Sequence, residues 1–105
     1  LGIDCSGFTQ LVYSLVGHAI PRDAYQQAEI GETIAFVDPA KPGDLLFFDN
    51  DDGRINHVGI ALGENQIIHA SGFVRIDNVD HEGIFMTKNK VYTHKLRLIK
   101  RVYEL

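Results

Sequence analysis

Residues 57–70 read HVGIALGENQIIHA, and this stretch decides the architecture of the chain. From residue 57 to residue 62, apolar residues alternate with small or polar ones, which is the pattern of a strand with one face against a core. Residues 63–65, Gly-Glu-Asn, predict a tight turn, and residues 66–70 predict a partner strand. The stretch therefore predicts an antiparallel β-hairpin.

The length of the hairpin loop decides whether His57 and His69 share a face of the sheet. A two-residue loop, Glu64-Asn65, places Ile60 opposite His69 and leaves His57 on the other side. A three-residue loop that starts at Gly63 pairs Gly59 with His69 and brings both histidines to one face.

Asn65 favours the three-residue loop, because such loops end on a residue in the left-handed conformation, which asparagine tolerates. In that register the two histidines point outward together, and Gly59 and Ala61 keep their face shallow for an extended substrate. The opposite face then enters the core through Val58, Ile60 and Leu62.

The remaining segments predict one leading helix and further strands. Residues 4–16 predict an amphipathic helix with Asp4 as its N-cap and Gly17 as its stop. Its apolar stripe against the core is predicted to be Phe8, Leu11, Val12 and Leu15. A shorter helical segment is expected over residues 22–30, and strands over residues 45–48, 74–79 and 96–103. A helix packed on a mainly antiparallel sheet defines an α+β fold.

The composition restricts the class of protein. A chain of 105 residues, 45% hydrophobic and 23% charged, predicts one domain over residues 1–105. A net charge of −4 disfavours nucleic acid and anionic membranes as partners. No apolar run reaches the roughly 18–20 residues of a membrane span. The basic residues near the C-terminus are expected on the solvated face of a strand: Lys95, Arg97, Lys100 and Arg101.

Cys5 is the single cysteine, which excludes an internal disulfide and a cysteine-based structural zinc site. It occupies the first helical position after Asp4, where free N–H groups and the helix dipole favour a thiolate. Thiols in such positions have pKa values of about 3.5–7.5. Gly7, in the same turn, is expected to leave room for a substrate beside the sulfur. The alternative is an inert, buried thiol.

A cysteine nucleophile needs an imidazole that takes its proton and a polar group that orients the imidazole. Cys5, His57 and His69 fit these three roles. The other histidines, which are His18, His81 and His94, are expected at the surface.

A metal site is the competing interpretation of the same residues. Cys5, His57 and His69, with Asp4 or Asp49, resemble a catalytic zinc set. The positive potential at a helix N-terminus disfavours a nearby cation, so we predict no metal and no other cofactor.

Five segments together resemble the NlpC family of cell-wall cysteine peptidases, in family order and with family-like spacing. They are residues 4–8 (DCSGF), 21–24 (PRDA) with Gln27, 42–48 (PGDLLFF), 57–60 (HVGI) and 68–70 (IHA).

The resemblance implies a papain-like α+β fold in which a helix carries the nucleophile. It assigns Cys5 as nucleophile, His57 as general base and His69 as the orienting residue. The implied reaction is hydrolysis of the γ-D-glutamyl–diamino acid bond of bacterial peptidoglycan stem peptides.

The resemblance also suggests how substrate is held. Asp4 and Ser6 match an acidic residue and a serine that bind a free N-terminal L-alanine, because a carboxylate pairs with an ammonium and a hydroxyl adds a hydrogen bond. Arg22 and Asp23 are candidates to line the cleft.

Family members carry a tyrosine- and glycine-containing segment before the nucleophile, and often a wall-binding domain before that. Only residues 1–3 precede Asp4 here, so we expect a catalytic-domain fragment. The expected location is the cell envelope or the exterior, with cytoplasmic recycling of muropeptides as the alternative. Two other functions stay open: an amidase, deamidase or acyl transferase on the same scaffold, and a non-catalytic peptide-binding module.

Overall fold

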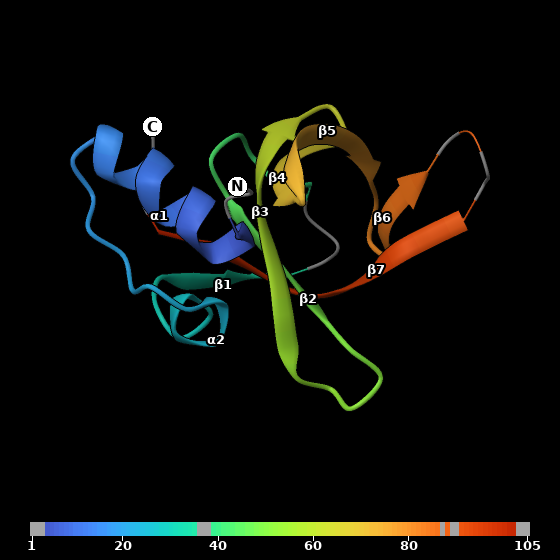
Figure 1. The fold of residues 1–105 in the computed structure, drawn as a ribbon, viewed down its shortest axis with the longest axis horizontal. Coiled ribbons are helices and arrows are strands. Elements are labelled where there is room, and N and C mark those ends of the chain that lie inside the picture. The colour runs from blue at the N-terminus through green and yellow to red at the C-terminus, as the bar shows by residue number, and fades with distance from the viewer. Residues whose placement is uncertain (1–3, 36–38, 87, 89–90, 103–105) are drawn as a thin grey trace.

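The computed structural model of the protein describes residues 4–35, 39–86, 88 and 91–102, which contain two helices and seven strands (Figure 1). The helices are α1 (Cys5–Leu15) and α2 (Ala24–Gln27). The strands are β1 (Glu32–Ile34), β2 (Leu45–Asp49), β3 (Ile55–Gly63), β4 (Gln66–Ser71), β5 (Phe73–Val79), β6 (Gly83–Met86) and β7 (Val91–Arg101).

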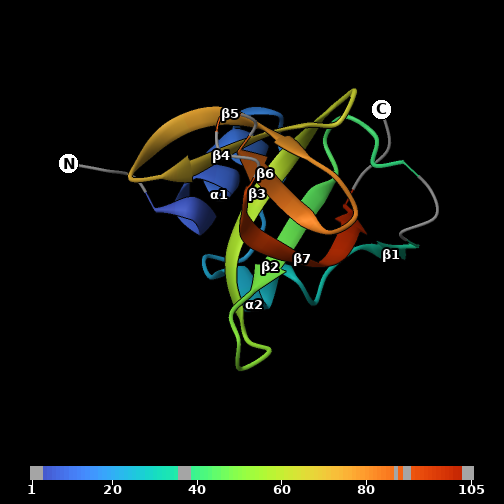
Figure 2. The same cartoon turned by 90° about the vertical axis from the view of Figure 1, so that its right-hand side faces the viewer.

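The strands form one antiparallel sheet in the order β1-β7-β2-β3-β4-β5-β6. Strand β6 also pairs with β7, so β2 to β7 close into a barrel and β1 extends it at one edge. Figure 2 shows β5, β6 and β7 curving past β2 and β3 to complete the closure. Helix α1 lies against β3 and β4, and α2 lies against β3. The α+β class and the antiparallel sheet are therefore confirmed.

Most predicted elements are present, with shifted ends. Helix α1 begins directly after Asp4, and Gly17 follows its last turn with φ +87°. Helix α2 is only four residues long, and β7 begins at Val91, five residues before the predicted start. The predicted last residue of that strand, Tyr103, lies outside the described residues. Strands β1 and β6 were not predicted, because three and four residues are too few to show an alternating pattern.

The β3–β4 hairpin corrects the predicted loop but keeps the predicted register. Gly63 pairs with Gln66, so the loop has two residues, Glu64 and Asn65, both with positive φ. An irregularity between Ala61 and Gly63 absorbs the odd residue, and Ile60 therefore lies opposite Ile68. This register continues to place Gly59 beside His69.

Two apolar clusters pack on the two faces of the sheet. Residues from β2 to β7 fill the barrel interior, and the main ones are Leu46, Phe48, Ala61, Ile67, Val79, Ile84, Leu96 and Ile99. The second cluster lies between the sheet and the helices and includes Tyr13, Ile20, Leu45, Phe47, Val58 and Ile60. Both faces of β2 and β3 are thus covered. The prediction that Leu62 enters the core was wrong, because 39% of it is exposed.

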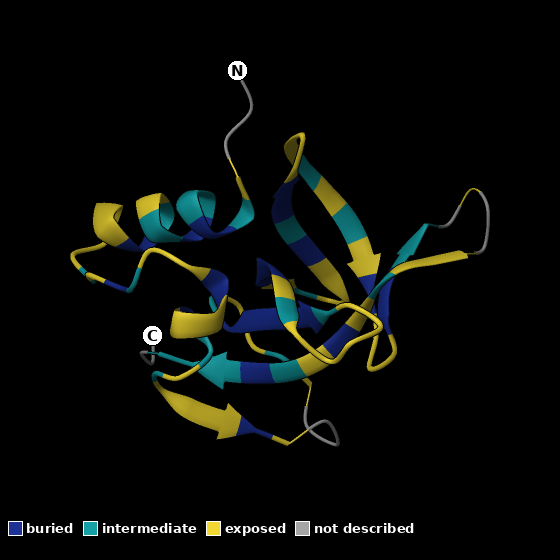
Figure 3. Cartoon of the chain, turned by 60° about the horizontal axis from the view of Figure 1, so that its bottom comes forward, coloured by how far each residue is buried: buried dark blue, intermediate teal, exposed yellow. Residues whose placement is uncertain are grey.

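The inward face of helix α1 matches the predicted one only in part, since Val12 packs against the second cluster as predicted. Leu11 and Leu15 are 50% and 77% exposed, whereas Ser6, Thr9 and Tyr13 are buried. The polar groups of this inner face have partners: Thr9 bonds the Gln27 side chain, and the Tyr13 hydroxyl donates to the Gly43 carbonyl. Figure 3 shows how much of α1 remains exposed beside the buried strands.

One residue of the predicted solvated basic face is half-buried, with 13% of its side chain exposed. Arg101 donates from Nε and Nη2 to the two carboxylate oxygens of Asp44, each at 2.9 Å. Asp44 is itself 2% exposed and also accepts from the Lys41 N–H. The pair connects the end of β7 to the turn before β2.

Within the described residues, neither helix is long and apolar enough to cross a membrane.

Candidate active site

The first turn of α1 holds Cys5 at the edge of the barrel. Asp4 is extended, and its Oδ1 accepts a hydrogen bond from the Gly7 N–H at 2.7 Å, which caps the helix. The half-buried Cys5 thiol lies 4.0 Å from the carbonyl oxygen of Asn56. The nucleophile candidate is therefore next to the strand residue that precedes His57.

The two histidines of the hairpin contact each other directly. Nε2 of His57 lies 2.8 Å from Nδ1 of His69, and the ring planes are nearly perpendicular at 86°. His57 is 7% exposed and His69 is 1% exposed. The shared face was predicted, but the outward orientation was wrong, because closure of the barrel turns that face into an interior.

Asp77 and Arg75 extend this pair from β5. Nε2 of His69 lies 2.7 Å from Oδ2 of Asp77, and Arg75 donates from Nη2 to Oδ1 of Asp77 at 3.0 Å. Neither residue was predicted as part of the site. A usable signal was present: charged residues at two alternate positions of one strand, directly after a short turn from the strand of His69.

The barrel interior changes the proton affinities of these groups. Burial lowers the pKa of His57 to about 3, and the neighbouring His94 and His69 act in the same direction. Burial alone raises the pKa of Asp77, but hydrogen bonds from His69 and Arg75 outweigh it, so the net pKa is below its usual range. At neutral pH the structure therefore contains a neutral His57 and an ionised Asp77.

His94 is part of the same cluster, which corrects its prediction as a surface residue. Its ring stacks on that of His57 with a centroid distance of 4.3 Å and an interplanar angle of 29°. The Phe48 ring contacts both rings, with centroid distances of 5.7 Å to His57 and 5.9 Å to His94. Of the other two histidines, His81 is exposed as predicted, while His18 is half-buried against Tyr13.

The two glycines near the site make room for side chains of the protein itself. A Cβ on Gly7 would lie 2.7 Å from Oδ1 of Asp4. A Cβ on Gly59 would lie 2.6 Å from Cδ1 of Ile67 and 2.9 Å from Cβ of His69. The predicted open floor for substrate at Gly59 is therefore wrong, since His69 and Ile67 occupy that space.

Arg22 joins the predicted substrate-binding residues at the start of α1. Its Nη2 donates to Oδ2 of Asp4 at 2.6 Å, and its Nη1 donates to the Ser6 hydroxyl at 2.9 Å. The Arg22 hydrogen bond, followed by that from Gly7, lowers the pKa of Asp4. Asp23 contributes differently, as the N-cap of α2.

Gln27 holds the first turn of α1 in place through hydrogen bonds of its side chain. It is fully buried, and its Nε2 donates to the carbonyls of Ser6 at 3.0 Å and Pro21 at 2.8 Å. Its Oε1 accepts from the Thr9 hydroxyl at 2.7 Å. The side chain therefore ties α2 to the turn that carries Cys5.

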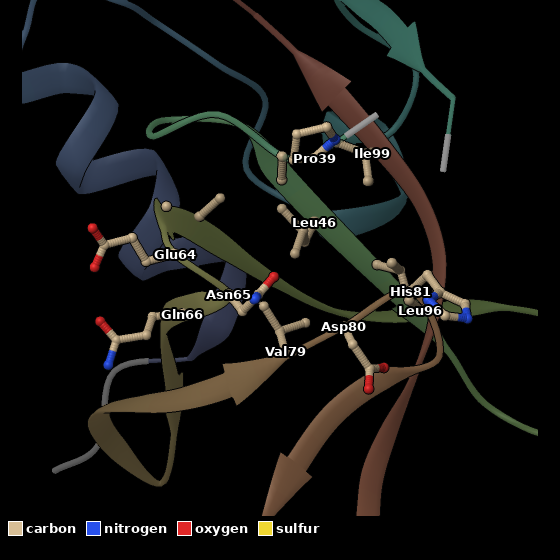
Figure 4. Close-up of a pocket in the computed structure, with 13 residues that line it drawn as sticks. Pro39, Leu46, Glu64, Asn65, Gln66, Val79, Asp80, His81, Leu96 and Ile99 are labelled. Carbon is tan, nitrogen blue, oxygen red and sulfur yellow. The ribbon is translucent and has the colours of Figure 1, made fainter. Parts of the chain in front are cut away.

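Several depressions lie around the barrel, one of them lined by Arg75 and Asp77. A groove of about 860 Å³ borders the site and is lined by Asn56 and His94 together with Asp49, Tyr92 and Lys95. A pocket of about 440 Å³ lies at the other end of the barrel interior, lined by Leu46, Val79, Leu96 and Ile99 among others (Figure 4). Across the described part of the chain, no three His, Cys, Asp or Glu side chains are grouped to hold a metal ion.

Comparison with known proteins identifies the family. The model of the NlpC/P60 family matches residues 1–97, and the chain therefore belongs to the NlpC/P60 family. Among solved structures, the peptidoglycan hydrolase RipB from Mycobacterium tuberculosis matches with a TM-score of 0.75 and 30% identity, over 97% of this chain and 46% of that chain. RipD from the same organism, described as a non-catalytic NlpC/p60 domain protein, shares the fold at a TM-score of 0.74 and 24% identity, over 98% and 69%.

Two curated relatives carry peptidase names. Gamma-D-glutamyl-L-lysine dipeptidyl-peptidase of Bacillus subtilis (strain 168) is 42% identical over 71 residues, which are 66% of this chain and 24% of that protein. Murein DD-endopeptidase MepS/Murein LD-carboxypeptidase of Escherichia coli (strain K12) is 43% identical over 72 residues, 67% of this chain and 37% of that protein. The chain thus spans well under half the length of these relatives.

Proposed function

We propose that this chain is the catalytic part of a cysteine peptidase that hydrolyses the γ-D-glutamyl–diamino acid bond of peptidoglycan stem peptides. The observation that carries the proposal is the 2.8 Å contact between His57 and His69, with the Cys5 thiol beside the residue that precedes His57. The name of the Bacillus subtilis relative supports the choice of bond. A nucleophile on a helix facing histidines on a sheet is the papain-like arrangement that we propose.

In the proposed reaction, His57 takes the Cys5 proton and the thiolate attacks the γ-carbonyl carbon of D-glutamate. The Cys5 N–H lies in the first turn of α1, where backbone N–H groups have no partner within the helix, and it donates to the developing oxyanion. His57 then protonates the leaving amine of the diamino acid. Water attacks the thioester, releases the acyl group and restores the thiol. His69 holds the ring of His57 throughout.

Substrate recognition is proposed for the cluster at the start of α1. Asp4 and Ser6 bind the free ammonium of an N-terminal L-alanine, and Arg22 and Asp23 line that end of the cleft. Arg22 already bonds Asp4 and Ser6, so it holds their oxygens in place. The proposed location is the cell envelope or the exterior, where such stem peptides occur, with cytoplasmic muropeptide recycling as the alternative.

Digestion of a defined tripeptide, L-Ala-γ-D-Glu-diamino acid, tests the proposal. Mass spectrometry of the products is expected to show L-Ala-D-Glu with the wild type and intact tripeptide with Cys5→Ala. Circular dichroism of both proteins controls for folding. Release of ammonia with an intact backbone, from the same tripeptide carrying a carboxamide on its diamino acid, would support an amidase or deamidase instead. A folded wild type that binds the tripeptide without cleaving it would support the non-catalytic module and overturn the peptidase.

A further inference from the structure

We propose that Asp77 is a positioning residue that sets the direction of the protons along His69 and His57. The expected effect on catalysis rests on the proposed function. The expected tautomers of the two histidine rings can be measured whether or not the chain is active. Asp77 is not one of the three residues that the catalytic assignment requires.

The relevant groups form an unbroken line of short contacts across three neighbouring strands. His57 on β3 contacts His69 on β4 at 2.8 Å, and His69 contacts Asp77 on β5 at 2.7 Å. The side chain of His69 is 2% exposed and that of Asp77 is 12% exposed. Because the line is buried, each ring nitrogen in it depends on its protein neighbour for a hydrogen bond.

A carboxylate at one end gives this line a direction. An ionised carboxylate accepts hydrogen bonds and donates none, so in the form of His69 that carries a single ring proton, that proton lies on Nε2. Nδ1 of His69 is then an acceptor, which requires a proton on Nε2 of His57. Neutral His57 carries one ring proton, and its Nδ1 is therefore unprotonated. That nitrogen is the free base that the thiol of Cys5 requires.

Arg75 adds to the stability of the ionised carboxylate at this end of the line. Its guanidinium donates to Oδ1 of Asp77 at 3.0 Å, and its Nε lies 2.7 Å from Oδ2. The lowered pKa of Asp77 agrees with this contact. An opposite charge at this distance favours the carboxylate over the carboxylic acid, which is the form that would donate a proton to His69.

Replacement of the Asp77 carboxylate by an amide removes the fixed direction of the protons along His69 and His57. The side chain keeps nearly the same shape. In the Asp77→Asn variant the amide offers both a donor and an acceptor to His69, so the protons along the line run either way. In the reversed state the proton of His57 sits on Nδ1, and the ring does not take a proton from the thiol. We therefore expect Asp77→Asn to lower kcat roughly 10- to 100-fold with KM unchanged.

Nitrogen NMR of histidine-labelled chain reads the tautomers directly. In the wild type near pH 7 we expect the Nε2 tautomer for both His57 and His69. In Asp77→Asn we expect a measurable population of the Nδ1 tautomer for both rings. An Nδ1–H on His57 in the wild type would overturn the proposal, and so would unchanged Nε2 tautomers in the folded variant.

Two further variants test whether a loss of kcat comes from altered histidine tautomers or from the loss of a charge. Arg75→Gln loses the ion pair but keeps the carboxylate acceptor, so it is expected to keep the wild-type tautomers and a kcat within about threefold of the wild type. Asp52→Asn removes one exposed negative charge away from the line and is expected to change neither. If Arg75→Gln loses as much kcat as Asp77→Asn while its tautomers stay unchanged, the ion pair and not the direction matters, which would overturn the proposal.

Two outcomes outside the main comparison are also decisive. If Asp77→Asn fails to fold, the wild-type tautomers and Arg75→Gln still decide. A wild type without peptidase activity would refute the proposed function, while the tautomers would still be measured.

Discussion

Gly59 lies so close to His69 that a Cβ on residue 59 would sit 2.9 Å from the Cβ of His69 and 2.6 Å from Cδ1 of Ile67. The position of the buried histidine therefore depends on the absence of a side chain on the neighbouring strand. Because the conformation of Gly59 itself is not left-handed, this requirement is one of space alone.

Gly59→Ala is expected to lower both stability and activity. Overpacking of a core costs about 1–3 kcal/mol of unfolding free energy, and displacement of His69 lowers kcat. The double variant Gly59→Ala/Ile67→Val removes Cδ1 of Ile67 and leaves the contacts with Cγ1 of residue 67 and with His69. Urea unfolding should show partial recovery of stability in the double variant, while peptide cleavage stays low. Full recovery of activity would show that only Ile67 was displaced.

Asp4→Asn separates the helix cap from the proposed substrate contact. Asparagine caps helices about as well as aspartate, so the unfolding free energy should change little. The variant loses the negative charge, and KM for the tripeptide with a free amino group should rise about tenfold. KM for the N-acetylated tripeptide, which has no ammonium, serves as the control. An equal change for both peptides would argue against an ammonium contact at Asp4.

His94 is expected to act through the stack of its ring on His57. His94→Phe keeps an aromatic ring there and should retain most of the activity. His94→Ala opens that face of His57, and the resulting loss of position should lower kcat roughly 10- to 100-fold. Steady-state kinetics on the same tripeptide compare the two. A large loss in both variants would instead assign a role to the imidazole nitrogens of His94.

Acid should destabilise the protein well before its carboxylates titrate. The pKa of His57 is about 3 in the folded chain against 6.5 for an unperturbed histidine. Between these values the unfolded chain binds one more proton, so the unfolding free energy falls as pH falls, by up to about 1.4 kcal/mol per pH unit. The lowered pKa of His94 adds to the slope with the same sign.

Urea unfolding at several pH values between about 7 and 4, the range in which an unfolded histidine gains its proton, measures this slope. His57→Gln carries no titrating group at that position and should give a clearly shallower dependence. The same slope in both proteins would mean that His57 is not the group responsible.

The hairpin shows how far the sequence determines the site. Alternation over residues 57–62 placed β3 correctly, and the register that joins His57 to His69 was predicted because side-chain direction has a period of two. The loop itself was wrong, since a bulge and a two-residue turn produce the same register as a three-residue turn. Local residues specify which face a histidine takes, and several local geometries satisfy that requirement.

Barrel closure explains most of what the sequence did not reveal. His94 and Asp77 lie 37 and 20 residues beyond His57. The pairing β4–β5 brings Asp77 to the site, and β7, which pairs with both β2 and β6, brings His94 there. Short strands such as β6 carry too little pattern to predict those pairings. The inner face of α1 was predicted only in part for a related reason: Thr9 is buried because Gln27, 18 residues away, provides its partner.

The closed barrel uses one interior for two purposes, since apolar packing fills one end and the line of ionisable side chains fills the other. A substitution that repacks the apolar end shifts the strands that carry the ionisable side chains. Selection for thermal tolerance and selection for turnover therefore act on the same small volume. Laboratory evolution of this chain should find improved variants of either kind mainly on the outer surface and the helices.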